Sequence, residues 1–275
     1  MPTASPAAIA KLPRQEPMTL GIIGVGAIAA AIVEGLQSTS AKSPIVLSPR
    51  NEQRASLLAS KFAEVQVAPT NQAVLDASEI VVIAVRPQIA HSVLSELRFR
   101  PHHRVVSLIP AVTLDYLRAI TAPACSVTRA VPLPSVARGQ SPTSMYPPDP
   151  SLKALFEKLG VVIELDREEE FEAFTTATAI MSSYFRFAET VVAWMQREGV
   201  SEAKAHAFVN QMLLGLAGAA AASPQSSFAE LTEEHQTHGG LNEQVLQSIT
   251  TAGVFTELER ALDGVLGRLV TGRPK

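Results

Sequence analysis

The sequence has only one cysteine, Cys125, in 275 residues, so no disulfide can form within the chain. A fold without disulfides suits a reducing compartment, and we expect a cytoplasmic protein. Charge is also scarce, because 18% of the residues are charged and the net charge is −3. The chain therefore offers no basic field for nucleic acid and no polybasic patch for a membrane. Its longest unbroken apolar stretches, residues 21–33 and 212–222, are shorter than the roughly 20 residues that span a bilayer.

Apolar residues are abundant, at 47%, over a length that suits two domains with a core each. The first 17 residues differ from the rest, because they are rich in Ala and Pro and lack regular periodicity. We expect them to form a disordered extension with no role in the chemistry. Cys125 precedes an apolar strand, and we expect it in the core rather than as a nucleophile.

Residues 18–36 read MTLGIIGVGAIAAAIVEGL, which predicts a short apolar strand, a glycine-rich turn and an apolar helix. The turn has the dinucleotide-binding spacing G-x-G-x-x-A, formed by Gly24, Gly26 and Ala29. The first glycine permits a sharp turn, the second lets a pyrophosphate approach, and the small third residue lets the helix pack on its strand. The alternative is an ordinary strand–helix unit of another doubly wound domain. The cofactor-binding residues expected here are Gly24, Gly26, Ala27 and Ile28.

Between residues 18 and 165, short segments rich in Val and Ile alternate with helical patterns. This alternation predicts a mostly parallel sheet covered by helices on both faces. The expected strands are residues 20–24, 45–48, 65–68, 80–85, 104–109, 126–129, 143–146 and 161–165. Helices are expected over residues 51–62, 71–77, 88–97 and 151–159, with Gly160 as the cap of the last one.

From residue 166 to 275 the pattern is helical throughout. The expected helices are residues 168–179, 180–197, 201–222, 228–234 and 241–267, with Glu168, Glu169 and Glu170 as the acidic first turn of the first helix. The helix 180–197 is apolar around most of its circumference, which predicts burial on several sides. So much apolar helical surface predicts that this second domain buries part of it against another copy of the chain, as a homodimer.

The end of the second strand indicates the type of cofactor. In NAD-binding sites an acidic residue about 20 positions beyond the glycines holds the ribose 2′-hydroxyl. Residues 47–51 read LSPRN, without an acid. Ser48, Arg50 and Asn51 would instead donate to a 2′-phosphate, and Arg54 lies one helical turn further on. We therefore expect NADPH to be preferred over NADH; the alternative is that these residues are solvated at a helix start.

Several motifs along the chain occur together in one known family. Residues 24–36 resemble its opening G-x-G-x-M and helix, and VIAVRPQ at 82–88 resembles its L-A-V-K-P-Q. VSLI at 106–109 resembles V-S-I-A, and TRAVPLP at 128–134 resembles V-R-A-M-P-N-x-P. THGGLN at 237–242 falls where this family has S-P-G-G-T-T. By these motifs, residues 18–270 resemble the pyrroline-5-carboxylate reductase family.

The resemblance implies a Rossmann-type, doubly wound, mostly parallel sheet followed by an all-α dimerisation domain. It also implies hydride transfer from NADPH to a cyclic imine, in an obligate dimer whose site lies near the subunit junction. Ligands of such sheets lie beyond the carboxyl ends of the strands. Further cofactor contacts are therefore expected from Val85, Arg86, Pro87 and Pro132.

The chain departs from the family at three places near the substrate. Leu133 replaces an asparagine, and the motif G-S-G-P-A-Y is reduced to AIMSSY, which keeps only Tyr184. Leu241 and Asn242 replace the paired threonines of the Gly-Gly-Thr-Thr turn. In the family this turn offers backbone amides to the substrate carboxylate and a hydroxyl to the ring nitrogen. Here the two glycines remain, and the hydroxyl does not.

Residues 235–244 form the most polar cluster of the helical part. We expect Gly239 and Gly240 to bind the substrate, His238 to give a proton to the imine or neutralise a carboxylate, and Asn242 to replace the second threonine. The alternative is a solvated loop in which Asn242 or Thr237 caps the last helix. No metal site is expected, because no Cys or third His accompanies His235 and His238.

The sequence leaves two alternative roles for each of two other residues. Tyr184 either faces the substrate or is a buried aromatic residue, and Arg129 either contacts a phosphate or anchors its loop. The overall expectation is an NADPH-dependent reductase of the C=N bond of a cyclic imino acid, from pyrroline-5-carboxylate to proline or a close analogue. The alternatives are a reductase of a different imine or ketimine and a non-catalytic homologue that senses the dinucleotide.

Overall fold

The computed structural model describes residues 18–40 and 42–271. The expected extension over residues 1–17 lies outside this part. The chain separates into two compact units, with the boundary between Phe171 and Glu172. The first unit contains the sheet, and the described part of the second unit is helical.

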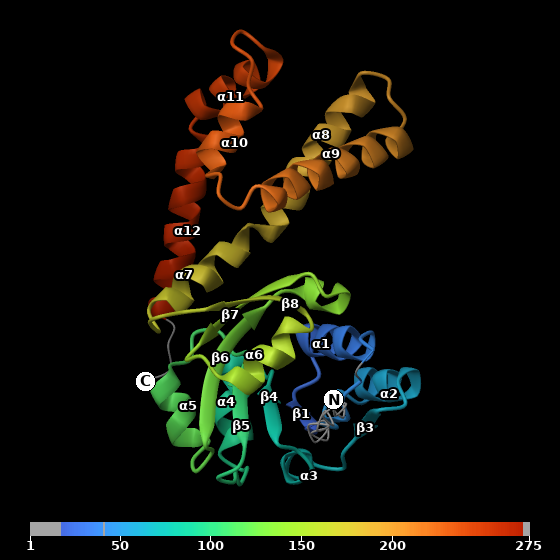
Figure 1. The fold of residues 1–275 in the computed structure, drawn as a ribbon, viewed down its shortest axis with the longest axis vertical. Coiled ribbons are helices and arrows are strands. Elements are labelled where there is room, and N and C mark those ends of the chain that lie inside the picture. Colours follow the sequence, from blue (N-terminus) through green and yellow to red (C-terminus); the bar gives the residue numbers. More distant parts are fainter. Residues whose placement is uncertain (1–17, 41, 272–275) are drawn as a thin grey trace, which may run out of the picture. The chain divides into compact units, whose positions relative to one another are not determined.

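An eight-stranded sheet forms the first unit, with the strand order β3-β2-β1-β4-β5-β6-β7-β8 (Figure 1). Every neighbouring pair is parallel except β6 and β7. The first six strands have the doubly wound order of dinucleotide-binding sheets, with a switch point between β1 and β4. This confirms the predicted mostly parallel sheet. The strands are β1 Leu20–Ile23, β2 Ile45–Leu47, β3 Val65–Val67, β4 Ile80–Ile83, β5 Arg104–Ser107, β6 Ser126–Pro132, β7 Ser141–Tyr146 and β8 Gly160–Glu164.

Helices connect most of these strands. They are α1 Ala27–Gln37, α2 Glu52–Lys61, α3 Asn71–Asp76, α4 Pro87–Leu94, α5 Leu114–Ile120 and α6 Pro150–Glu157, with a 3₁₀ helix η1 at Pro134–Arg138. The sequence patterns did not predict α5 or η1. The N-terminus of α5 has a local signal, because the Thr113 hydroxyl accepts a hydrogen bond from the Tyr116 amide.

Gly160 does not cap a helix, so that expectation is wrong. Helix α6 ends at Glu157 with Lys158 as its C-cap, and Gly160 is the first residue of β8. Its φ is +139°, and a Cβ there would collide with the backbone of Ser141 on β7. The glycine is therefore needed for the close approach of β7 and β8.

The sheet has a hydrophobic core on each face, because successive strand residues point to opposite sides. Ile22, Val82 and Val106 lie in one core, and Ile23, Val81, Ile83 and Val105 lie in the other. Helix α1 and η1 pack against each other beside the first core. Their contact is close at Gly35, where a Cβ would collide with the carbonyl oxygen of Val136.

Arg129 on β6 is buried, with 1% of its side chain exposed, and anchors the end of the first unit. Its Nη1 donates to Oε1 of Glu168 at 2.8 Å, and the same oxygen accepts from the Leu114 amide at 2.7 Å. The guanidinium carbon lies 4.0 Å from the centre of the Phe171 ring. Of the two roles left open, Arg129 has that of an anchor. Glu168 is not in the first turn of a helix, because α7 begins two residues later at Glu170.

Helices make up the described part of the second unit and the segment that leads into it. They are α7 Glu170–Ala177, η2 Thr178–Ile180, α8 Met181–Arg197, α9 Glu202–Ala222, α10 Phe228–Glu234, α11 Leu241–Thr251 and α12 Val254–Thr271. The expectation of one continuous helix over residues 241–267 is wrong. Helix α11 ends at Thr251 and α12 begins at Val254, and Gly253 between them has a φ of +76°.

Helix α8 has no buried residue, so the expected burial on several sides is wrong for the single chain. Phe185 is 69% exposed, Phe187 56% and Trp194 54%. Helix α9 packs against α8 and buries only Ala205 and Val209. By length and composition alone α9 could cross a membrane, and 11% of its apolar window is buried here. Within the described residues this apolar surface is left exposed, and large exposed apolar patches mark interaction sites.

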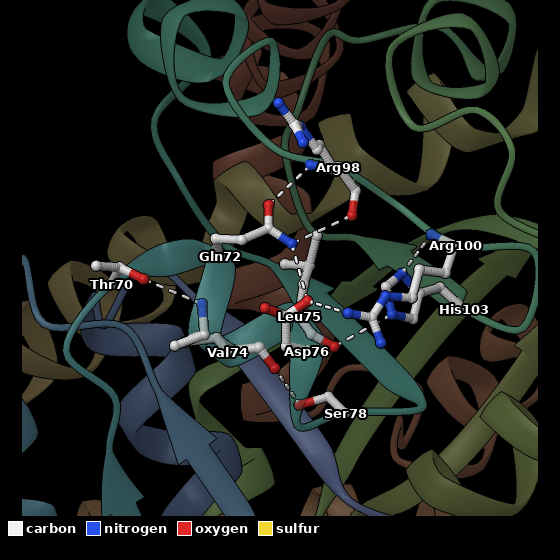
Figure 2. Close-up of polar contacts among 10 residues, drawn as sticks. Thr70, Gln72, Val74, Leu75, Asp76, Ser78, Arg98, Arg100 and His103 are labelled. Carbon is white, nitrogen blue, oxygen red and sulfur yellow. Dashed lines mark hydrogen bonds and ion pairs between the residues drawn. The ribbon is translucent and has the colours of Figure 1, made fainter.

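A polar network lies at the amino edge of the sheet, between α3 and the loop that leads into β5 (Figure 2). Asp76 accepts from Arg100 Nη2 at 2.6 Å and from Gln72 Nε2 at 3.1 Å. Buried His103 accepts from the Arg100 amide through Nδ1 and bonds the Leu75 carbonyl oxygen through Nε2, at 3.0 and 3.1 Å. Since a carbonyl oxygen can only accept, His103 is the neutral tautomer with its proton on Nε2.

Burial lowers the pKa of His103, and the neighbouring His102 and Arg100 lower it further. Near pH 6.5 the unfolded chain therefore binds more protons at His103 than the folded chain does. We expect the free energy of unfolding to fall as the pH drops below that value, by at most about 1.4 kcal/mol per pH unit from this group. Urea unfolding at about pH 7.5 and about pH 5.5 measures the difference.

His103→Gln should reduce this pH dependence, because glutamine can still donate to Leu75 and does not titrate. The matched control is His206→Gln, at an exposed histidine of α9, which should keep the parent's dependence. Equal pH dependence in the parent and His103→Gln would contradict the assignment.

Candidate functional site

The glycine-rich turn follows β1 at the switch point of the sheet. Gly24 has a φ of +94°, and a Cβ there would lie 2.7 Å from the carbonyl oxygen of Ala84, beyond β4. The Ala84 amide donates to Ile23 at 2.8 Å, which holds the loop after β4 against the end of β1. A side chain at residue 24 would separate these two strand ends, so glycine is required for the turn.

The end of β2 holds the same turn from the other side. The Gly24 amide donates to the Ser48 hydroxyl at 2.9 Å, and Asn51 Nδ2 donates to the Val25 carbonyl at 3.0 Å. Ser48 is buried. The sequence predicts these two side chains as donors to a 2′-phosphate. In the structure both shape the glycine-rich turn, while the Ser48 hydroxyl keeps its own hydrogen and Asn51 a second N–H, so that prediction stays open.

Two arginines beside this turn remain exposed. Arg50 lies between Ser48 and Asn51, and Arg54 is in the first turn of α2. Neither guanidinium has an ion-pair partner within residues 18–40 and 42–271. They are the positive charges that the first unit offers at the carboxyl end of β2.

Helix α1 begins at Ala27 with Gly26 as its N-cap, and no side chain caps it. Its first intrahelical bond runs from Ala30 to Gly26, so the amides of Ala27, Ile28 and Ala29 are available to a ligand. A Cβ at Gly26 would meet nothing within 4 Å, and the first turn carries no acidic residue. This is an open, positively polarised N-terminus of the kind that binds pyrophosphate. The residues present fit a dinucleotide.

The remaining expected cofactor residues lie at the same edge of the sheet. Val85 and Arg86 follow β4, and Pro87 opens α4 with Arg86 as its N-cap. Pro132 is the buried last residue of β6, and the next amide, of Leu133, donates to the Ser141 hydroxyl at 2.8 Å. Since β1, β4 and β6 run parallel, these residues share the carboxyl edge with the glycine-rich turn.

The Gly-Gly turn lies between α10 and α11 in the second unit. The Gly239 amide donates to Oε2 of Glu243 at 2.5 Å, and the Gly240 amide donates to the Thr237 carbonyl at 2.7 Å. Asn242 Nδ2 donates to the His235 carbonyl at 2.7 Å. The amides of Gly239 and Gly240, the two expected substrate contacts, are thus engaged inside the turn. Neither Asn242 nor Thr237 caps α11, whose N-cap is Gly240.

The side chain of Glu243 accepts the hydrogen bond from the backbone amide of Gly239 in this turn. Its Oε1 lies 3.6 Å from Nδ1 of His238, whose ring is fully exposed. Glu243 also borders a hollow of about 320 Å³, which is at the small end of the range for ligand pockets. The lining residues are Gln236, Glu243, Leu246, Gln247, Thr250 and Thr251.

Glu243 belongs to the polar cluster expected from the sequence, but its bond to the backbone of the turn was not predicted, although a signal was present. Glutamate at the third position of a helix commonly turns back to a backbone amide near the N-cap. Residues 239–243 read GGLNE, which places a glutamate at that position.

The other candidates contribute less. Tyr184 on α8 is half-exposed with its ring against Phe185, so it is not buried within the chain. Cys125 is exposed rather than in the core, which corrects the expectation; its thiol donates to the His103 carbonyl at 3.3 Å. Within the described residues, no three His, Cys, Asp or Glu side chains gather in a way that could hold a metal ion.

Each of the two units matches a known protein family. Residues 19–110 match the family described as NADP oxidoreductase coenzyme F420-dependent, and residues 168–269 match the family described as pyrroline-5-carboxylate reductase dimerisation. A pyrroline-5-carboxylate reductase of Haemophilus influenzae is 25% identical over 263 residues, which cover 90% of this chain and 95% of the relative.

Solved structures show the same fold. The 1-pyrroline-5-carboxylate reductase of Streptococcus pyogenes has a TM-score of 0.81 at 23% identity, covering 94% of this chain and 100% of that one. The pyrroline carboxylate reductase of Plasmodium falciparum with NADP bound has a TM-score of 0.79 at 16% identity, covering 93% and 98%. The dinucleotide-binding sheet, the matching dimerisation domain and these relatives lead to one conclusion: the chain belongs to the pyrroline-5-carboxylate reductase family of NAD(P)-dependent oxidoreductases.

Proposed function

We propose that this protein transfers a hydride from NADPH to the carbon of a cyclic C=N bond. The observation that carries the cofactor half is the uncapped N-terminus of α1 at the switch point between β1 and β4. The imine half rests on the reaction named for the relatives and on the match of residues 168–269. The sequence predicts pyrroline-5-carboxylate or a close analogue, and this remains a prediction.

The proposed chemistry asks little of the side chains. A protonated imine carbon is already electrophilic, so the protein has mainly to align it with the nicotinamide and exclude water. The nicotinamide supplies the hydride. The amides of Ala27 and Ile28 would hold the pyrophosphate, and Val85, Pro87 and Pro132 would border the nicotinamide.

The turn of the second unit would supply the polar groups for the substrate. His238 carries an exposed ring that can donate a proton, and Asn242 keeps its Oδ1 as an acceptor while its Nδ2 bonds His235. We keep both as candidate catalytic residues, with Gly239, Gly240 and Tyr184 as candidate substrate contacts.

The purified protein should oxidise NADPH only when a cyclic imine is added, because the imine is the hydride acceptor. The measurement is the loss of NADPH absorbance with a panel of five- and six-membered cyclic imines, with and without a carboxylate. Binding of NADPH without oxidation by any member of the panel would contradict the proposal and favour a dinucleotide sensor.

Arg50→Ala should weaken NADPH binding by roughly tenfold or more and leave NADH binding nearly unchanged, because a charge-assisted hydrogen bond to the 2′-phosphate is lost. Fluorescence titration of both cofactors measures the effect. Arg118→Ala, at an exposed arginine of α5, is the matched control and should bind both cofactors as the parent does. Equal affinity of the parent for NADPH and NADH would overturn the preference.

We further propose that the second unit forms a homodimer through the exposed apolar faces of α8 and α9. The matching dimerisation domain covers both helices, and contact with a second copy accounts for the apolar α9 without a membrane. Sedimentation at micromolar concentration should show a dimer. Phe185→Glu should raise the dissociation constant roughly tenfold or more, since burying an aromatic side chain contributes roughly 1.5–3 kcal/mol.

Leu57→Glu is the control, because Leu57 is about as exposed as Phe185 and lies on α2 in the first unit. This variant should remain dimeric. A folded monomer of the parent, or equal effects of the two substitutions, would refute this interface.

A further inference from the structure

The Gly-Gly turn already holds a carboxylate that belongs to the chain. Oε2 of Glu243 accepts from the Gly239 amide at 2.5 Å, and the Gly240 amide is bonded to Thr237. In the family that the motifs resemble, amides of this turn receive the substrate carboxylate. Here the side chain of the third residue of α11 occupies one of these donors, and a substrate carboxylate would have to displace it.

The charge around this turn is unfavourable for a second anion. Glu243 is the only charged residue among those that border the adjoining hollow, and the other five offer amides, hydroxyls and one leucine. No Lys or Arg of the described chain lines it. The ring of His238, with Nδ1 3.6 Å from Oε1 of Glu243, already faces that carboxylate. The positive end of α11, where the amides of Leu241, Asn242 and Glu243 lack intrahelical partners, already has the Glu243 carboxylate beside it, so an incoming carboxylate would meet a like charge with no Lys or Arg of the lining to compensate it.

The side chains at the turn suit a cation better than an anion. The side-chain amide of Asn242 donates one of its two N–H groups to the His235 carbonyl and presents Oδ1 as an acceptor. Leu241, where the family has a threonine, is 81% exposed, and its side chain offers no donor. A carboxylate and a carbonyl oxygen accept hydrogen bonds from an N–H⁺ group, which is what a protonated imine presents.

We propose that Glu243 takes the place of the substrate carboxylate, so that this protein reduces cyclic imines without a carboxylate beside the C=N bond and binds them as iminium cations. The inference rests on the proposed imine reduction. In the step, the hydride forms a new C–H bond at the iminium carbon, and the π electrons of the C=N bond become the lone pair of the amine nitrogen. The amine then takes a proton from solvent, and Glu243 acts as a specificity-determining counter-ion.

The test compares 1-pyrroline with 1-pyrroline-5-carboxylate at saturating NADPH. The parent should favour 1-pyrroline in kcat/KM by roughly tenfold or more, because the carboxylate of 1-pyrroline-5-carboxylate is repelled by the charge of Glu243 and 1-pyrroline has no such group. Glu243→Gln removes that charge and keeps an acceptor for Gly239, and should lower the preference roughly tenfold. Glu243→Ala also frees the Gly239 amide and should lower it further. The KM for NADPH should not change in either variant.

Glu259→Gln, at an exposed glutamate of α12, makes the same charge change away from the turn and should keep the parent's preference. A parent that prefers the carboxylated imine, or a Glu243→Gln variant with the same preference as Glu259→Gln, overturns the inference and leaves imine reduction standing. Turnover of neither imine, with NADPH still bound, overturns imine reduction and the inference together.

Discussion

The turn after β1 can form only if three strand ends come together around Gly24. The residue takes a left-handed φ, its missing Cβ leaves room for Ala84 beyond β4, and its amide is bound by Ser48 at the end of β2. This arrangement sets where α1 begins, and therefore where its unpaired amides point. The order of the sheet places the turn at the switch point, so the position of the proposed cofactor follows from the same contact.

The sheet could be predicted because its signal is local. Short Val- and Ile-rich segments separated by helical patterns are enough to identify buried parallel strands, and all eight lie within a few residues of their expected places. The strand ends were less well predicted, since they depend on neighbours. β6 runs on to Pro132 because β7 pairs with it antiparallel, and the short strands stop where the chain turns away at the carboxyl edge.

The site was harder to predict, because its polar groups are defined by partners distant in the chain. The sequence predicts Ser48 as a phosphate ligand but does not show its contact with Gly24, 24 residues earlier, which gives it a structural role as well. Arg129 had two plausible roles, and burial against Glu168 decided between them, since a buried guanidinium requires a partner. The apolar circumference of α8 predicts burial, but periodicity does not say whether the same chain covers the helix, and within the described residues none of α8 is buried.

The close contact at Gly35 also affects how the first unit can respond to a ligand. One end of α1 offers the amides for a pyrophosphate, and further along the same helix Gly35 rests on Val136 of η1, which follows Pro132. Because α1 and η1 are in close contact at Gly35, a shift of α1 would also move η1, so the two helices form one preorganised unit. The cofactor would not have to order this unit on binding. Less of the binding free energy would therefore be lost to conformational entropy.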